Sequence, residues 1–257
     1  MPFTLSHPAA VLPLLRGVRG RGPLIASALV AGSMAPDVPY FAASLRPGAY
    51  RHGVLTHRWW AVPTVDVAIA GALVAGWYGV RVPLLALLPD RWAAAADAAT
   101  APSVRWPSRG EAAAFALSAA VGAATHVGCD AFTHQGRAGV RLLPALNREV
   151  AGVPLCTVLQ YGMSALALGG LGRYLARELP PSQGLPPRAV GGRSAGRRLL
   201  GLAAALGAAH RVARSTQVRG PGQPRSPIED VCFGAGAGTA AGAVLLAAAR
   251  HLADPPR

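Results

Sequence analysis

The sequence predicts an all-α protein, a polytopic integral membrane helical bundle with about five or six apolar helices. Hydrophobic residues make up 52% of the 257 residues and charged residues only 14%, against about 25% charged residues in typical soluble domains. The apolar residues gather in runs long enough to cross a bilayer, and the arginines fall between these runs. Aromatic residues make up only 6% of the chain, which disfavours an aromatic-rich β architecture.

The first apolar segments are too short to cross a bilayer alone, because a spanning helix needs about 20 apolar residues. They cover residues 8–15 and 24–34, and Pro36 and Pro39 are expected to break the second one. A later run at residues 199–209 is also short and predicts a partial span or an interfacial helix. The runs long enough for a single crossing lie at residues 61–80, 112–133, 153–171 and 230–249.

Two longer connections separate these runs. Residues 83–109 contain proline and tryptophan and are expected to lie along the membrane interface. Residues 179–198 are rich in Pro, Gly and Arg and predict a flexible connector. Because cytoplasmic loops carry an excess of Lys and Arg, this connector is expected on the cytoplasmic side. It divides the chain into a membrane domain at 1–178 and a C-terminal extension at 199–257 with one or two apolar helices.

The first basic residue, Arg16, follows the first apolar segment. The chain start therefore has no basic n-region, and we expect no cleavable signal peptide. The expected location is the cytoplasmic membrane, with several crossings.

The formal net charge of +14 predicts a membrane topology signal rather than a nucleic-acid interface. All 25 basic residues are arginine, and with the high Ala, Gly and Pro content this is typical of GC-rich coding. Nucleic-acid binders cluster their basic residues on one face, whereas these arginines lie between apolar runs. Membrane lipids are therefore the expected partner, and no nucleic acid is expected. The three cysteines are too few and too scattered for a disulfide framework or a zinc knuckle.

A group of His and Asp residues near residue 130 is the most informative feature of the sequence. On an α-helix, His126, Asp130 and His134 lie within about 80° of one another, on one face. Imidazole nitrogens and a carboxylate on successive turns can converge on one divalent ion. The alternative is a hydrogen-bonded His/Asp cluster buried at a helix end.

Further candidate ligands lie before the first long apolar run. Asp37 lies between two prolines, where it either stops a helix or binds a metal. His57 lies two residues before a Trp-Trp pair, where by itself it would be an interfacial histidine beside an aromatic belt. Two successive crossings return the chain to the same side of the membrane, so Asp37 and His57 share a side with His126. His7 joins them if the segments before Asp37 form a hairpin or half-helices rather than one crossing. The His and Asp residues gathered at these segment ends together predict a metal site at one membrane face.

His and carboxylate ligands suit zinc, and also manganese or iron. A bound ion lowers the pKa of its water and polarises carbonyl or phosphoryl groups. At a bilayer surface the nearest substrates of that kind are lipid esters and phosphodiesters. The expected cofactor is therefore a divalent metal, with zinc favoured.

Several segments also resemble a family of bacterial multipass membrane proteins, the domain of unknown function family 4184. The resemblance covers residues 1–178 and is carried by MPFTLSHPAAVLPL around His7, GSMAPDVPYF around Asp37, the Thr-His pair ending at His57, THVGCDAFTH ending at His134, and the Leu-Gln pair ending at Gln160. The remainder of the chain is then expected to be a variable extension.

That family is similar to YdjM-type membrane-bound metal-dependent hydrolases and, more distantly, to all-α zinc phospholipases C. The resemblance implies that the metal ligands are His7, Asp37, His57, His126, Asp130 and His134. The sequence lacks the later His-x-x-x-Glu of the phospholipases, which favours one or two ions over three.

Three functions remain open from the sequence. The first is a metal-dependent hydrolase site at one membrane face, with lipid phosphodiesters as the expected substrates. The second is a non-catalytic scaffold in which the same cluster holds helices together or binds a structural metal. The third is a transporter that uses Asp66, Gln160 and the His residues, since ionisable groups inside a membrane often mark ion pathways.

Overall fold

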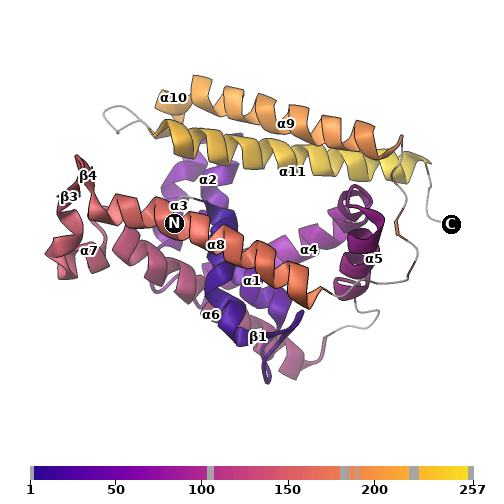
Figure 1. Ribbon diagram of the computed structural model, residues 1–257, viewed down its shortest axis with the longest axis horizontal. Coiled ribbons are helices and arrows are strands. Elements are labelled where there is room, and N and C mark those ends of the chain that lie inside the picture. Colours follow the sequence, from indigo (N-terminus) through magenta and orange to yellow (C-terminus); the bar gives the residue numbers. More distant parts are fainter. Residues whose placement is uncertain are drawn as a thin grey trace. The chain divides into compact units, whose positions relative to one another are not determined.

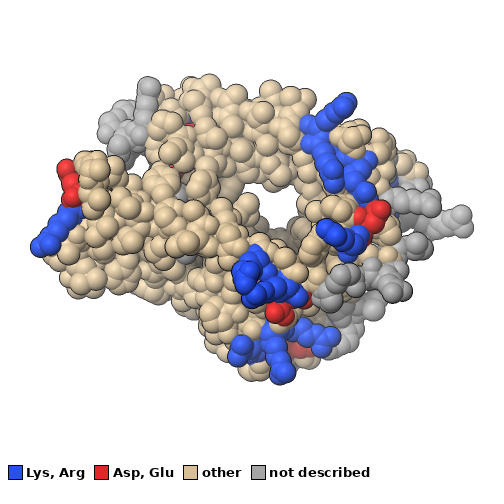
Figure 2. Space-filling view, viewed as in Figure 1, with Lys and Arg blue, Asp and Glu red and all other residues tan. Residues whose placement is uncertain are grey.

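The computed structural model is almost entirely helical and describes residues 3–102, 107–179, 191–219 and 226–253, together with 184, 186, 187 and 189 (Figure 1). Among these residues, four helices are long and apolar enough to cross a membrane: α4 (Val65–Leu85), α6 (Arg109–Thr133), α8 (Leu155–Glu178) and α11 (Pro227–Ala253). They contain most of each of the four predicted long runs, so the predicted all-α class is confirmed. Figure 2 shows charged side chains in small groups, with most of that face free of charge.

Shorter elements connect these helices. The 3₁₀ segments are η1 (Thr4–Leu14), η2 (Ala35–Asp37), η3 (Pro47–Ala49) and η4 (Pro144–Asn147). The other helices are α1 (Ala26–Met34), α2 (Val38–Ala42), α3 (Tyr50–Thr56), α5 (Asp90–Ala99), α7 (Ala138–Leu142), α9 (Arg193–Ala213) and α10 (Ser215–Arg219). Two antiparallel two-residue ladders pair β1 (Leu15–Arg16) with β2 (Arg19–Gly20) and β3 (Glu149–Val150) with β4 (Val153–Pro154).

Two predictions about the connections need correction. The segment 83–109 is not simply a loop, because α4 continues to Leu85 and α5 follows at once. The alanines of α5 favour a helix, because alanine has the highest helix propensity. The prediction for this segment rested on its Pro and Trp content instead. The helix α9 begins at Arg193, inside the predicted connector, and extends beyond the predicted run at 199–209. Trp106 and most of residues 180–190 lie outside the described residues.

The chain divides into two compact units. Unit 1 comprises residues 1–38, 54–73 and 107–178, and unit 2 comprises residues 39–53, 74–106 and 179–257. Unit 1 ends at residue 178, as the predicted membrane domain does, but two inner segments of that stretch cluster with unit 2. The division into a family domain and an extension stays a prediction.

In unit 1 the backbones of α1 and α6 approach closely. A Cβ atom on Gly32 would lie 2.1 Å from the carbonyl oxygen of Ala119, and one on Gly122 would lie 2.2 Å from that of Leu29. Small residues permit this close helix packing inside a membrane. The Ser118 hydroxyl also accepts a hydrogen bond from the Ile25 amide at 2.9 Å. The start of α1 is thereby fixed against Ser118, in the first half of α6.

The α6 helix has a well-defined start. Ser108 caps it, and Glu111 completes a reciprocal capping box with the Ser108 backbone. This arrangement satisfies amide groups that the first helical turn leaves without a partner. The long α6 helix is therefore fixed at its N-terminus and carries its polar face at the other end.

In unit 2, α9 and α11 pack as an antiparallel pair (Figure 1). A Cβ atom on Gly207 would lie 2.3 Å from the Gly234 carbonyl oxygen, and one on Gly238 would lie 2.0 Å from that of Ala203. The contact therefore depends on glycine in both helices. Beside it, the fully buried Arg211 forms an ion pair with Asp230 at 3.1 Å.

Candidate functional site

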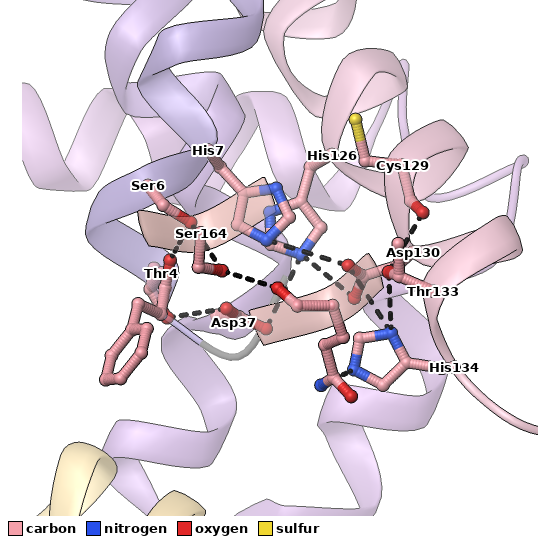
Figure 3. Close-up of polar contacts among 12 residues, drawn as sticks. Thr4, Ser6, His7, Asp37, His126, Cys129, Asp130, Thr133, His134 and Ser164 are labelled. Carbon is pink, nitrogen blue, oxygen red and sulfur yellow. Dashed lines mark hydrogen bonds and ion pairs between the residues drawn. The ribbon is translucent and has the colours of Figure 1, made fainter. Parts of the chain in front are cut away.

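The structure brings all six predicted His and Asp residues into one buried cluster in unit 1, and Figure 3 labels all of them except His57. His7 comes from η1, Asp37 from η2 and His57 from the residue after α3. His126 and Asp130 come from α6, and His134 directly follows that helix. The side chains of the first five are at most 8% exposed, whereas that of His134 is 27% exposed.

The local sequence explains how Asp37 reaches this cluster. Pro36 and Pro39 flank it, and α1 ends at Met34 before the short η2 segment, as the sequence predicts. Proline cannot continue the hydrogen bonding of a preceding helix. The α-helix therefore gives way to the 3₁₀ segment η2, and the Asp37 carboxylate faces the ring nitrogens of His57 and His126 at 3.5 Å each.

The shared face of α6 is also as predicted. Nε2 of His126 lies 3.6 Å from Oδ2 of Asp130, one turn further along the helix. Nε2 of His57 lies 3.4 Å from the same oxygen and 3.2 Å from Nε2 of His126. Two imidazoles therefore face two carboxylates across a small space.

The facing atoms of His57, His126 and Asp130 are spaced as three ligands of one divalent ion. Zinc bonds to His nitrogen and carboxylate oxygen are about 2.0–2.2 Å long, so neighbouring ligand atoms in a tetrahedron are about 3.4 Å apart. The five measured separations among His57, His126, Asp37 and Asp130 run from 3.2 to 3.6 Å. Two carboxylates and neutral imidazoles also balance the charge of a divalent cation. Two triads, His7–Asp37–His126 and His57–His126–Asp130, could each hold a metal ion.

His7 supports the same interpretation from a different observation. Its ring stacks on that of His126 with centroids 3.6 Å apart, and its side chain is fully buried. Neither ring nitrogen has a hydrogen-bond partner among the described residues. Nε2 of His7 lies 3.6 Å from Oδ1 of Asp130. A buried polar group without a partner is costly, and a metal ion near Asp130 would remove that cost.

Neighbouring groups fix the orientation of the candidate ligands. Nδ1 of His126 lies 2.7 Å from the Ser33 carbonyl oxygen, so it carries the proton and leaves Nε2 free to bind. The Thr4 hydroxyl donates to Oδ2 of Asp37 at 2.5 Å. The Thr56 hydroxyl donates to the Pro36 carbonyl oxygen at 2.6 Å, which joins the segments of His57 and Asp37. Such supporting hydrogen bonds are typical of metal sites.

His134 lies at the edge of the cluster. Its Nδ1 is 3.5 Å from Oδ1 of Asp130, and its Nε2 accepts a hydrogen bond from the Gln160 amide at 3.0 Å. Gln160 belongs to α8, where the Ser164 hydroxyl donates to its carbonyl oxygen at 2.9 Å. His134 is in neither triad that could hold an ion. Its partial exposure places it where the cluster meets the surface.

The protonation of the cluster outside the spanning helices suits metal binding. Burial lowers the pKa of His7 well below its usual value, and the nearby His126 acts in the same direction. Burial alone would raise the pKa of Asp37, but the facing imidazoles of His126 and His57 outweigh it and lower this pKa. A neutral imidazole and an ionised carboxylate are the forms that bind metal.

Other residues noted in the sequence lie elsewhere. His52, His210 and His251 are exposed. Asp66 is fully buried in the first turn of α4, and neither carboxylate oxygen has a hydrogen-bond partner among the described residues. The three cysteines are free thiols, of which only Cys156 is fully buried.

Sequence reasoning missed the supporting groups. Thr4 and Ser33 are polar residues inside apolar segments and are now buried beside the cluster. That placement was the one available signal, since a buried hydroxyl usually has a specific partner. The Ser33 contact uses a backbone carbonyl, which no side-chain pattern can indicate.

Comparison with known proteins gives a family but no characterised relative. A search of curated proteins and a search of solved structures found no match. The family model described as a domain of unknown function, DUF4184, matches residues 1–248. The match extends beyond residue 178, where the resemblance in the motifs ends, and includes α9 and most of α11. The chain therefore belongs to the DUF4184 family.

Proposed function

We propose that this protein is a metal-dependent hydrolase of the membrane surface, acting on lipid esters or phosphodiesters. The observation that carries the proposal is the triad of His57, His126 and Asp130, whose facing atoms lie 3.2–3.6 Å apart as the ligands of one ion do, with Asp37 3.5 Å from both imidazoles. Zinc suits this donor set best, and manganese or iron also suit it. The similarity to YdjM-type hydrolases and zinc phospholipases C rests on the motifs alone and is part of this proposal.

The protein residues would divide the work between holding and orienting. A bound divalent ion supplies an activated water and polarises a carbonyl or phosphoryl oxygen. Asp37 and Asp130 would balance its charge, while Ser33 and Thr4 keep His126 and Asp37 in the binding orientation. His134 is the most exposed member and would meet the substrate first.

The geometry supports one ion or two. Oδ2 of Asp130 faces His57 and His126, whereas Oδ1 faces His7 and His134. Oδ2 of Asp130 would therefore hold an ion together with His57 and His126, and Oδ1 would hold a second ion together with His7 and His134. Nε2 of His126 can bind only one of them, because Nδ1 is engaged by Ser33.

A structural role for the same cluster is the second candidate. Its burial favours this role, because the cluster joins η1, η2, the end of α3 and α6 and exposes only His134. A structural metal site is typically closed by four protein ligands, and a catalytic one keeps an open position. A transporter has less support. Gln160 contacts His134 at the cluster, and the Asp66 carboxylate in α4 has no hydrogen-bond partner among the described residues.

Turnover by the zinc-loaded protein separates these functions. The protein in nanodiscs would be assayed with bis(p-nitrophenyl) phosphate, a p-nitrophenyl ester and fluorescent phospholipids. We expect turnover of at least one probe, its loss in Asp130→Asn and His126→Ala, and unchanged turnover in His251→Ala, a control at an exposed histidine of α11. Zinc binding without turnover of any probe supports the structural role. Equal turnover in wild type and Asp130→Asn contradicts the hydrolase.

A further inference from the structure

The segment that connects α6 to α8 borders the open side of the cluster. It covers residues 135–154 and contains α7, η4 and the β3–β4 ladder. His134 lies just before it and Gln160 just after it, and these two side chains are hydrogen-bonded at 3.0 Å. We call residues 135–154 the rim segment. The rim segment therefore directly follows His134, the most exposed member of the cluster.

The rim segment exposes large apolar side chains. The exposed fractions are 76% for Leu142, 52% for Leu143, 52% for Val150 and 41% for Val153. Contiguous exposed apolar residues usually mark an interaction surface. The rim segment directly joins two helices that are long and apolar enough to cross a membrane. Its apolar side chains are thus placed to enter the acyl boundary of the bilayer.

Three arginines accompany these apolar residues. Among the described residues, Arg137, Arg141 and Arg148 make no side-chain hydrogen bond or ion pair, whereas Arg81, Arg193 and Arg211 are paired with Asp97, Asp90 and Asp230. The rim segment has only one acidic residue, Glu149, so its net charge is +2. These guanidinium groups are available to an anion outside the protein.

Arg137 also lies close to the cluster. Its backbone amide donates to the His134 carbonyl oxygen at 3.3 Å. On another side of the cluster, His57 is followed by Arg58 and by Trp59 and Trp60, which are 59% and 56% exposed. Tryptophan is enriched where a membrane meets water. Both segments leave the cluster from residues that lie within 3.5 Å of Asp130.

We propose that the rim segment binds anionic phospholipids, with Arg137, Arg141 and Arg148 at the headgroup phosphates and Leu142 and Leu143 among the acyl chains. Guanidinium groups bind phosphate oxygens in a bidentate manner, and basic residues beside membrane helices attract anionic lipids. The inference deepens the proposed hydrolase by naming its lipid class and rests on that function for turnover only. Lipid binding itself requires no metal.

The test measures lipid binding to the metal-free protein. Native mass spectrometry would follow titration with phosphatidylglycerol or phosphatidylcholine. We expect tighter binding of phosphatidylglycerol, and a loss on the order of 100-fold when all three arginines become glutamine, at roughly fivefold per charge. The variant Leu142→Ser/Leu143→Ser should weaken both lipids.

A matched control removes the same charge from the other end of unit 1. Arg16, Arg19 and Arg173 are exposed there, near the Tyr174 hydroxyl that donates to the Gly17 carbonyl oxygen. Arg16→Gln/Arg19→Gln/Arg173→Gln should leave the lipid preference unchanged.

Three results overturn the inference: equal binding of the two lipids, an equal loss in the control, or displacement of the lipid by inorganic phosphate. Lipid binding without turnover by zinc-loaded protein contradicts the hydrolase and leaves the inference standing.

Discussion

Two buried polar clusters occur in this apolar protein, and they are built differently. In unit 2, Arg211 donates to Asp230 at 3.1 Å, to the Tyr40 carbonyl oxygen at 2.7 Å and to the Ser44 hydroxyl at 3.2 Å. Its guanidinium also lies 5.7 Å from the ring centre of Phe233. One cation meets one anion at hydrogen-bonding distance, so the charge of this cluster is balanced by a direct ion pair.

In the cluster of unit 1, the imidazoles and carboxylates lie further apart. Two carboxylates face four imidazoles, and their N–O separations are 3.4–3.6 Å, longer than ordinary hydrogen bonds. His7 has no hydrogen-bond partner among the described residues. The spacing suits atoms that share an ion rather than a proton.

The difference separates a structural ion pair from a binding site. Both clusters are buried, so burial alone does not distinguish them. What distinguishes them is whether the facing side chains meet at hydrogen-bonding distance. Substitutions should therefore act on folding in unit 2 and on metal binding in unit 1.

The largest effect is expected in unit 2. Asp230→Ala leaves Arg211 buried without its counter-charge, which should lower the free energy of unfolding by about 3–5 kcal/mol. Thermal denaturation in detergent would measure this loss. The double variant Asp230→Ala/Arg211→Met should regain much of the stability. An equal loss in the double variant contradicts the assignment of the pair as the cause.

A smaller effect is expected from the groups that orient the metal ligands. Thr4→Val removes the hydroxyl that holds Asp37, and Gln160→Leu removes the amide that holds His134. Each should weaken zinc binding by about 10–100-fold, as loss of a supporting hydrogen bond does in other metal sites. Competition with a chelating dye measures the affinity.

Thr239→Val is the matched control, because the exposed Thr239 hydroxyl donates to the Ala235 carbonyl oxygen within α11. Unchanged affinity in Thr4→Val would show that Asp37 needs no such support.

The smallest effect is a gradual dependence of metal-free stability on pH. His7 has a pKa below its usual 6.5, so acid favours the unfolded chain, and the loss should begin as pH falls through about 6.5. Asp37 has a pKa below its usual 3.8, so its contribution is present above that pH and is lost below it. Urea titrations of metal-free protein at several pH values measure this. Greater stability at pH 5 than at pH 7 contradicts the sign.

Local spacing predicted much of the site, and tertiary packing supplied the rest. The i, i+4 spacing placed His126 and Asp130 on one face of α6, whereas His134 follows the end of that helix in extended backbone. The two prolines predicted the end of the α-helix before Asp37. The Ser33 carbonyl and the Thr4 hydroxyl reach the cluster only because η1 and α1 pack against α6, and spacing along the chain does not encode that packing.

The two units also differ in how far the fold was predictable. The long apolar runs predicted the candidate spans, because hydropathy acts over a whole helix. Hydropathy did not indicate that Arg211 and Asp230 form an ion pair, since their contact depends on close packing between α9 and α11. In the sequence, nothing distinguishes the glycines that permit this packing from other small residues.

Metal content tests the central claim most directly. Wild type, His126→Ala and the exposed-residue control His251→Ala would be incubated with zinc, desalted and analysed by mass spectrometry of the metal. We expect at least one zinc per chain in wild type and in His251→Ala, and loss of zinc in His126→Ala. A wild-type protein that retains no zinc, manganese or iron, or a His126→Ala variant that retains as much zinc as wild type, contradicts the assignment of this cluster as a metal site.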